Sequence, residues 1–164
     1  MHEQAEAVAP QVAYEWWMLC ETHQLHNRFA LDSSTETERK MSLECFLLHA
    51  RNLYHFLTRR RRDLKRFEAT DVLAEDFFDV PLEWTPATNL TFLGDKENME
   101  RLNRSLSHIS YDRVDYERSK RWVLLNRIRH ELAEAWNSFL DRLPEARRKW
   151  FLIATDSQSR SNPR

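Results

Sequence analysis

The sequence contains little glycine and little cysteine. Gly94 is the one glycine in 164 residues, and there are two cysteines. Glycine adopts positive φ at low cost, so its scarcity argues against hairpin-rich folds and against the glycine loops that bind phosphate groups. Cys20 and Cys45 have no CxxC partner and no zinc-like spacing, and both lie in apolar helical contexts. We therefore expect two reduced, buried thiols in a cytoplasmic protein.

Long apolar runs and a leader pattern are also missing. No stretch of apolar residues approaches the length that a membrane-spanning helix needs. The first ten residues, MHEQAEAVAP, lack the basic segment followed by an apolar segment that marks a secretory signal. These patterns predict a protein without membrane contact.

The residues that are abundant favour helices. Leu, Glu, Arg and Ala are common, and all four are good helix formers. Charged residues make up 31% of the chain and nearly balance, at a net charge of −1, which is typical of a solvated helical surface. The sequence therefore predicts an all-α, single-domain bundle of four to five main helices with short additional helices over residues 1–154. A disordered polar tail is expected at 155–164.

The first two predicted helices differ in character. The first runs from about Ala5 or Pro10 to about Leu31, with Pro10 near its start because proline suits the first turn. The second covers roughly 35–60, and Ser34 or Thr35 with Glu38 forms a capping box at its start. Its segment MSLECFLLHARNLYHFL is apolar on nearly every side. A helix of this kind is usually central, so we expect the second helix to occupy the middle of the bundle.

The rest of the chain alternates turns and amphipathic helices. Four arginines at 59–62 predict a basic helix end or turn. The irregular segment 79–94 is expected to be held in place by Leu82, Trp84 and Phe92. The further predicted helices are a short one within 70–78, one from about 95 with a core stripe of Met99, Leu102, Leu106 and Ile109, one at about 115–143 that buries Trp122, Leu125, Ile128, Leu132, Trp136 and Phe139, and one at 145–153.

Metal and cofactor chemistry finds no support in the residue spacings. No helix carries the Glu-x-x-His pattern of di-metal bundles. His130 is followed four residues later by Glu134, where the zinc-protease motif needs a second histidine. His23 and His26 lie one turn apart and could share a metal ion. They are better explained as polar residues on an amphipathic helix. We expect no metal and no cofactor.

Two polar segments lie on strongly helical stretches and supply the candidate binding residues. The first contains His49, Arg51 and Asn52, and the second contains Asn103, Arg104, His108, Tyr111 and Arg113. Buried polar groups are costly unless they form hydrogen bonds. These side chains therefore either form a network between helices, for example through Glu44 and Arg51, or line a functional cleft.

The spacing of these residues resembles that of known helical families. The motifs Glu44…His49-x-Arg51-Asn52-Leu53, Asp71-Val72-Leu73-Ala74-x-Asp76-Phe77 and Asn103-x-x-x-x-His108-x-x-Tyr111-x-Arg113 resemble a family of small helical bacterial proteins of uncharacterised activity. More distantly, the chain is similar to HEPN domains. That resemblance implies a four- to five-helix bundle, often dimeric, of the kind found in RNA-cleaving toxins, in phage-defence proteins and in non-catalytic versions.

In the HEPN motif, four to six residues separate an arginine from a following histidine, and a polar residue comes directly after the arginine. Arg101 and His108 have the right spacing, but Leu102 follows the arginine, and Arg104 lies too close to His108. The resemblance implies that His108 would act as general acid or base and that Arg101 or Arg104 would stabilise charge on the phosphate. The activity implied is metal-independent RNA cleavage.

A non-catalytic module is the function that we place first. Six tryptophans and nine phenylalanines exceed what one small core readily hides, and surplus aromatic surface marks interfaces. Trp16 and Trp17 point about 100° apart on a helix, so one of them is expected to face outward. The partner would be another protein or a second copy of the chain. RNA is a further possible partner, through the arginines at 59–62.

Overall fold

The structure is a computed structural model, and it describes residues 2–31, 35–64, 70–87, 90–107 and 121–151. Within these ranges the chain is all-α and contains no strand. Its elements are α1 (His2–Leu31), α2 (Glu36–Thr58), α3 (Lys96–Ser107), α5 (Arg121–Arg142), a helical segment at 145–151, and the 3₁₀ turns η1 (Arg61–Asp63), η3 (Ala74–Phe77) and η4 (Pro81–Glu83). None of the described helices is long and apolar enough to cross a membrane. The predicted tail at 155–164 lies outside the described residues.

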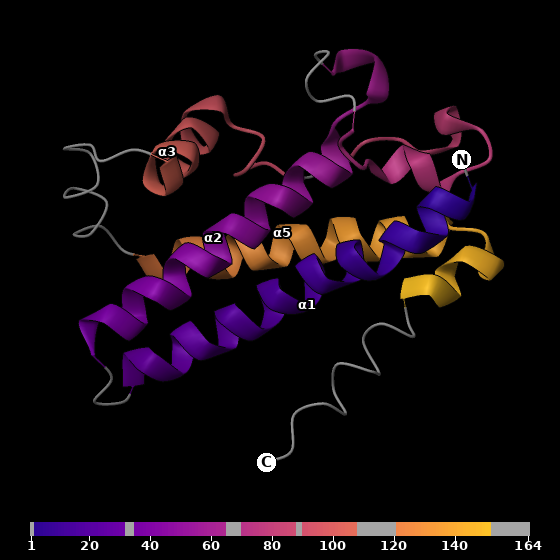
Figure 1. Ribbon diagram of the computed structural model, residues 1–164. Helices are drawn as coiled ribbons and strands as arrows, with labels where there is room; N and C mark the ends of the chain where they lie inside the picture. Colours follow the sequence, from indigo (N-terminus) through magenta and orange to yellow (C-terminus); the bar gives the residue numbers. More distant parts are fainter. Residues whose placement is uncertain (1, 32–34, 65–69, 88–89, 108–120, 152–164) are drawn as a thin grey trace.

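Helix α2 is central, as predicted. It packs against α1, α3, α5 and η3. Figure 1 shows α1 and α2 side by side, with α5 passing behind them and α3 set apart from α1. The capping box is also confirmed, and its threonine is Thr35. The backbone N–H of Thr35 donates to Glu38 Oε2 (2.8 Å), and the backbone N–H of Glu38 donates to Thr35 Oγ1 (3.2 Å).

The start of α1 differs from the prediction. The helix begins at His2 and contains Pro10 in its interior, although proline lacks the N–H group of a helical hydrogen bond and crowds the carbonyl of residue i−4. Tertiary packing offsets this cost, because Ala5 and Ala9 are buried in the core on the segment before the proline. The alanine- and glutamate-rich sequence of this segment also has high intrinsic helix propensity.

An aromatic cluster fills the end of the bundle where α2, η3 and α5 meet. The ring of Phe139 is fully buried, and its centroid lies 5.1 Å from that of Phe56 and 5.3 Å from that of Phe151. The rings of Phe77, Phe78, Trp84 and Trp136 complete the contacts around Phe139. Most of these contacts are edge-on or tilted, the geometry that aromatic quadrupoles favour. The predicted buried face of the long helix is confirmed at Leu125, Ile128, Leu132, Trp136 and Phe139.

Two charged side chains fasten the irregular segment to the C-terminal half of the chain. Arg147 donates to the backbone carbonyl of Phe77 (2.6 Å) and pairs with Asp79. Glu131 accepts hydrogen bonds from the backbone N–H of Phe92 (3.0 Å) and from the hydroxyl of Thr91 (2.7 Å). Of the three predicted apolar anchors, Trp84 is buried and Phe92 is half-buried, whereas the side chain of Leu82 lies outside the described part of the chain.

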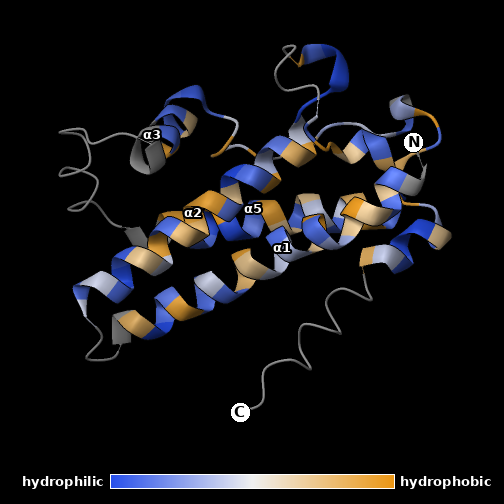
Figure 2. Cartoon of the chain, in the orientation of Figure 1, coloured by the Kyte–Doolittle hydropathy of each residue, from blue (hydrophilic) through white to orange (hydrophobic). Residues whose placement is uncertain are grey.

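The expectation that both thiols are buried is wrong for Cys45. This side chain is exposed, and Cys20 is half-buried. The physical reason is that α2 is not enclosed on every side. Met41 and Leu48, at 60% and 43% exposure, lie on the same outward side of the helix as Cys45. Figure 2 shows hydrophobic and hydrophilic residues interleaved along α1 and α2.

Candidate ligand pocket and outer face

Three polar side chains meet where α1 and α2 pack together. The carboxylate of Glu15 on α1 accepts two hydrogen bonds through Oε2, from His49 Nδ1 (2.7 Å) and from Asn52 Nδ2 (3.0 Å), both on α2. His49 and Asn52 lie three residues apart, so they project from neighbouring faces of one helix and can reach the same acceptor. The ring of His49 also makes an edge contact with Tyr14, at a centroid distance of 6.0 Å. These contacts fix the position of the Glu15 carboxylate.

The carboxylate of Glu15 is ionised at neutral pH. Partial burial by itself would raise its pKa, because removal of water disfavours the charged form. The hydrogen bonds from His49 and Asn52, together with the electrostatic effect of His49, outweigh burial, so the pKa lies below its ordinary value of 4.5. Since an ionised carboxylate can only accept, the Nδ1 of His49 is the donor in this pair.

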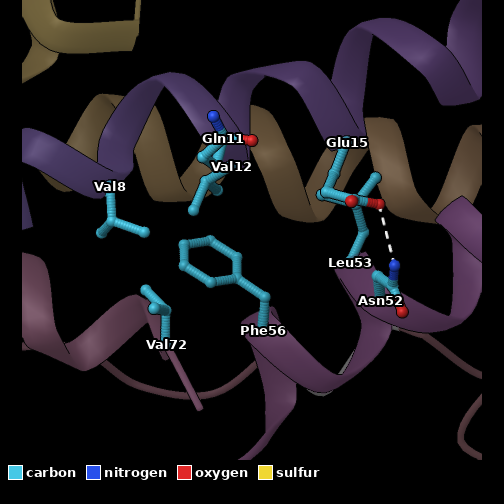
Figure 3. Close-up of a pocket in the computed structure, with 8 residues that line it drawn as sticks. All are labelled: Val8, Gln11, Val12, Glu15, Asn52, Leu53, Phe56 and Val72. Carbon is cyan, nitrogen blue, oxygen red and sulfur yellow. Dashed lines mark hydrogen bonds between the residues drawn. The ribbon is translucent and has the colours of Figure 1, made fainter. Parts of the chain in front are cut away.

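A pocket of about 220 Å³ opens beside this cluster. Its apolar wall is formed by Val8, Val12, Leu53, Phe56 and Val72. In Figure 3 the ring of Phe56 points into the space between the valines. Three polar side chains, Gln11, Glu15 and Asn52, complete the lining. Among the described residues that line the pocket, none carries a hydroxyl, thiol or imidazole group, so the pocket offers a binding surface without a nucleophile.

The sequence predicted part of this site. His49 and Asn52 were expected to be binding residues, and the structure brings them together on Glu15. Arg51 lies about 200° around α2 from His49 and is half-buried on a different side. Sequence reasoning missed Glu15, which is an ordinary polar residue on an amphipathic helix until α2 is packed against it. The predicted network through Glu44 and Arg51 stays a prediction.

The remaining predicted site residues lie elsewhere. Asn103 is on α3, half-buried, and its Oδ1 is buried without a hydrogen-bond partner in the described part of the chain. Arg101 and Arg104 lie on the same helix. The other three predicted residues, His108, Tyr111 and Arg113, lie outside the described residues.

His23 and His26, which were considered as metal ligands, form hydrogen bonds with other side chains. His26 shares a buried hydrogen bond with the hydroxyl of Ser42 (3.0 Å), and His23 bonds the side chain of Asn126 (2.8 Å). Both contacts join α1 to other helices. Burial lowers the pKa of His23, and the hydrogen bond to Asn126 opposes that effect only in part. These two side chains therefore serve as links between helices.

The arginine turn that follows α2 lies among carboxylates. Arg59 lies 3.5 Å from Asp71, Arg60 lies 3.5 Å from the buried Glu75, and Arg61 pairs with Asp76. Arg62 lies 3.7 Å from its neighbour Asp63. These carboxylates reduce the positive potential that the turn presents to a phosphate backbone.

Exposed apolar side chains gather on the outward side of α2. Met41, Cys45 and Leu48 fall within about 60° of one another around the helix. Trp16 and Trp17, the adjacent pair on α1, are both half-buried. Trp16 stacks on Trp136 at 5.4 Å, whereas Trp17 lies beside Tyr14 at 5.9 Å. We call the surface formed by Met41, Glu44, Cys45, Leu48 and Arg51 the α2 outer face.

Comparison of the chain with protein-family models, with curated proteins and with solved structures finds no match.

Proposed function

We propose that this chain is a non-catalytic helical-bundle module, HEPN-like in type, that forms a homodimer through the α2 outer face. The observation that carries the proposal is the exposed apolar stripe of Met41, Cys45 and Leu48. An exposed stripe at helical spacing on a well-packed element is typical of an interface with another helix. The HEPN-like type is inferred from the sequence motifs alone, and the dimeric state of many HEPN domains is one reason that a second copy is the proposed partner.

The charges along the α2 outer face favour a second copy as the partner. Glu44 lies one turn before Leu48, and Arg51 lies about one turn after it. A two-fold axis near Leu48 makes the two α2 helices antiparallel, and it brings Glu44 of each copy toward Arg51 of the other. A parallel arrangement would instead place like charges together. The stripe is therefore self-complementary only in the antiparallel arrangement.

The pocket chemistry supports a non-catalytic role. Its lining offers one fixed carboxylate and no nucleophile among the described residues. The imidazole of His49 donates to Glu15 and is mostly buried, with a side-chain exposure of 9%. A general base needs to reach its substrate, and His49 is not among the side chains that line the pocket.

Sedimentation equilibrium over a wide range of protein concentration tests the dimer. We expect a reversible dimer that Leu48→Glu dissociates, because a charge would be buried without a partner. The matched control is Val80→Glu, since Val80 is also an exposed apolar residue, at 49% exposure, but lies between η3 and η4 and is not part of the α2 outer face. A monomer at every concentration, or equal effects of the two substitutions, would contradict the proposal.

A charge reversal sharpens the same test. Glu44→Arg should weaken the dimer, and the double variant Glu44→Arg with Arg51→Glu should restore it, because the pair across the two-fold axis is regenerated with opposite sign. Restoration would not be expected if each residue acted only within its own copy.

An RNA cleavage assay separates this proposal from the ribonuclease alternative. Single-stranded RNA incubated with the protein and a chelator should remain intact. Metal-independent cleavage that His108→Ala abolishes would instead place the chain among the HEPN-like ribonucleases.

A further inference from the structure

The pocket beside Glu15 combines a hydrocarbon wall with one fixed negative charge. Val8, Val12, Phe56 and Val72 supply apolar surface from α1, α2 and the segment before η3. Glu15 supplies the charge. The volume of about 220 Å³ is below the roughly 300–1,000 Å³ of pockets that hold drug-sized ligands. The pocket is therefore matched to a small ligand with one short apolar group.

The carboxylate of Glu15 is held in place before any ligand arrives. His49 and Asn52 both bond Oε2, whereas Oε1 has no hydrogen-bond partner in the described part of the chain. One oxygen is thus fixed by the protein, and the other can accept a further hydrogen bond. A carboxylate positioned by two donors loses little side-chain entropy when it binds a cation. Its charge repels anionic ligands.

We propose that this pocket binds a small primary ammonium compound with a compact hydrocarbon body, such as an arylalkylamine. The ammonium group donates to Oε1 of Glu15, and the hydrocarbon body packs between Val8, Val12 and Phe56. Charge-assisted hydrogen bonds are stronger than neutral ones, so the ammonium group provides selectivity and the apolar group provides contact area. The binding does not require self-association.

Three ligands of similar shape test the charge requirement. Protein uniformly labelled with ¹⁵N is titrated with 2-phenylethylammonium, with neutral 2-phenylethanol and with anionic phenylacetate. We expect amide shifts along the pocket-facing parts of α1 and α2. The ammonium compound should bind about tenfold more tightly than the alcohol, the effect of one charge-assisted hydrogen bond. Phenylacetate should bind more weakly than either.

Two substitutions assign the binding to this pocket. Glu15→Gln should remove the preference for the ammonium compound, so that the ammonium compound and the alcohol bind with similar affinity. Glu6→Gln, an equal charge change at an exposed position of the same helix, should leave the preference intact. Val8→Phe should fill the pocket and weaken the binding of both ligands. Val8 is half-buried and lines the pocket, so the larger ring can occupy the pocket without displacing the buried core.

Circular dichroism melts of each variant show whether it is folded. The proposal is overturned if the folded native protein shows no shifts at millimolar ligand, or if it binds the alcohol as tightly as the ammonium compound. It is also overturned if a folded Glu15→Gln variant keeps the ammonium preference, or if a folded Val8→Phe variant binds as the native protein does.

Discussion

Two carboxylates, on two sides of the bundle, differ in how many hydrogen-bond partners surround them. On the side where α5 meets the irregular segment, Glu131 accepts hydrogen bonds from Thr91, from the backbone of Phe92 and from Arg127. On the side where α1 meets α2, Glu15 accepts both of its hydrogen bonds through Oε2. Its side chain also lines a pocket. We call these the closed side and the open side. The difference indicates that the closed side stabilises the fold and that the open side is available for recognition.

The largest expected effect lies in the aromatic cluster of the closed side. Phe139→Ala removes a fully buried ring that contacts Phe56 and Phe151, so it should lower the free energy of unfolding by about 4 kcal/mol. Leu48→Ala removes an exposed apolar side chain on the α2 outer face and should change that free energy by less than about 0.5 kcal/mol. Urea unfolding monitored by tryptophan fluorescence measures both. Equal losses would contradict the distinction between the enclosed closed side and the exposed α2 outer face.

The second prediction concerns the closed-side carboxylate. Glu131→Ala leaves the backbone N–H of Phe92 and the hydroxyl of Thr91 without their acceptor, and it should destabilise the protein by about 3 kcal/mol. Glu134→Ala, at an exposed position one turn further along α5, is the matched control and should change stability by less than about 0.5 kcal/mol. Hydrogen exchange at Phe92 should accelerate in the first variant only. Unchanged exchange there would show that Glu131 does not hold the segment.

The smallest effect is expected at Glu15, and it depends on pH. Folding lowers the pKa of this carboxyl below 4.5, so its contribution to stability is fully present above about pH 4.5 and is lost as the pH falls through the lowered value. Glu15→Gln should therefore cost about 1 kcal/mol near neutral pH. The difference from the native protein should shrink in acid.

Chemical denaturation at several pH values measures this difference. Glu6→Gln is the control on the same helix and should change stability by less than about 0.5 kcal/mol near neutral pH. A difference at Glu15 that grows as the pH falls would mean that the hydrogen bonds from His49 and Asn52 do not stabilise the charged form.

Much of the fold could be predicted because local signals agree with the tertiary structure. The capping box at Thr35 and Glu38 marks the start of α2 within one residue. The spacing of Leu125, Ile128, Leu132 and Phe139 identifies the buried face of α5, because apolar side chains at helical period must face one direction. The early start of α1 was missed, since the cost of an internal Pro10 is offset by contacts from distant parts of the chain.

The candidate site was predicted only in part, for a related reason. His49 and Asn52 attract attention because they are polar residues in an apolar helix. Glu15 carries no such signal, because its importance depends on which residues of α2 come to lie against it. The α2 outer face was also misjudged, since a helix that is apolar on nearly every side can still have one side that no other described element covers.

The sequence by itself therefore determined the helical class, the start of α2 and the aromatic composition of the core. These properties depend on residue propensity and on periodicity within a single segment. Only the tertiary structure decided that Glu131 is enclosed by its partners, that Glu15 borders a pocket, and that Met41 and Leu48 remain exposed. These properties depend on which helices pack together, and the periodicity of one segment does not specify its neighbours.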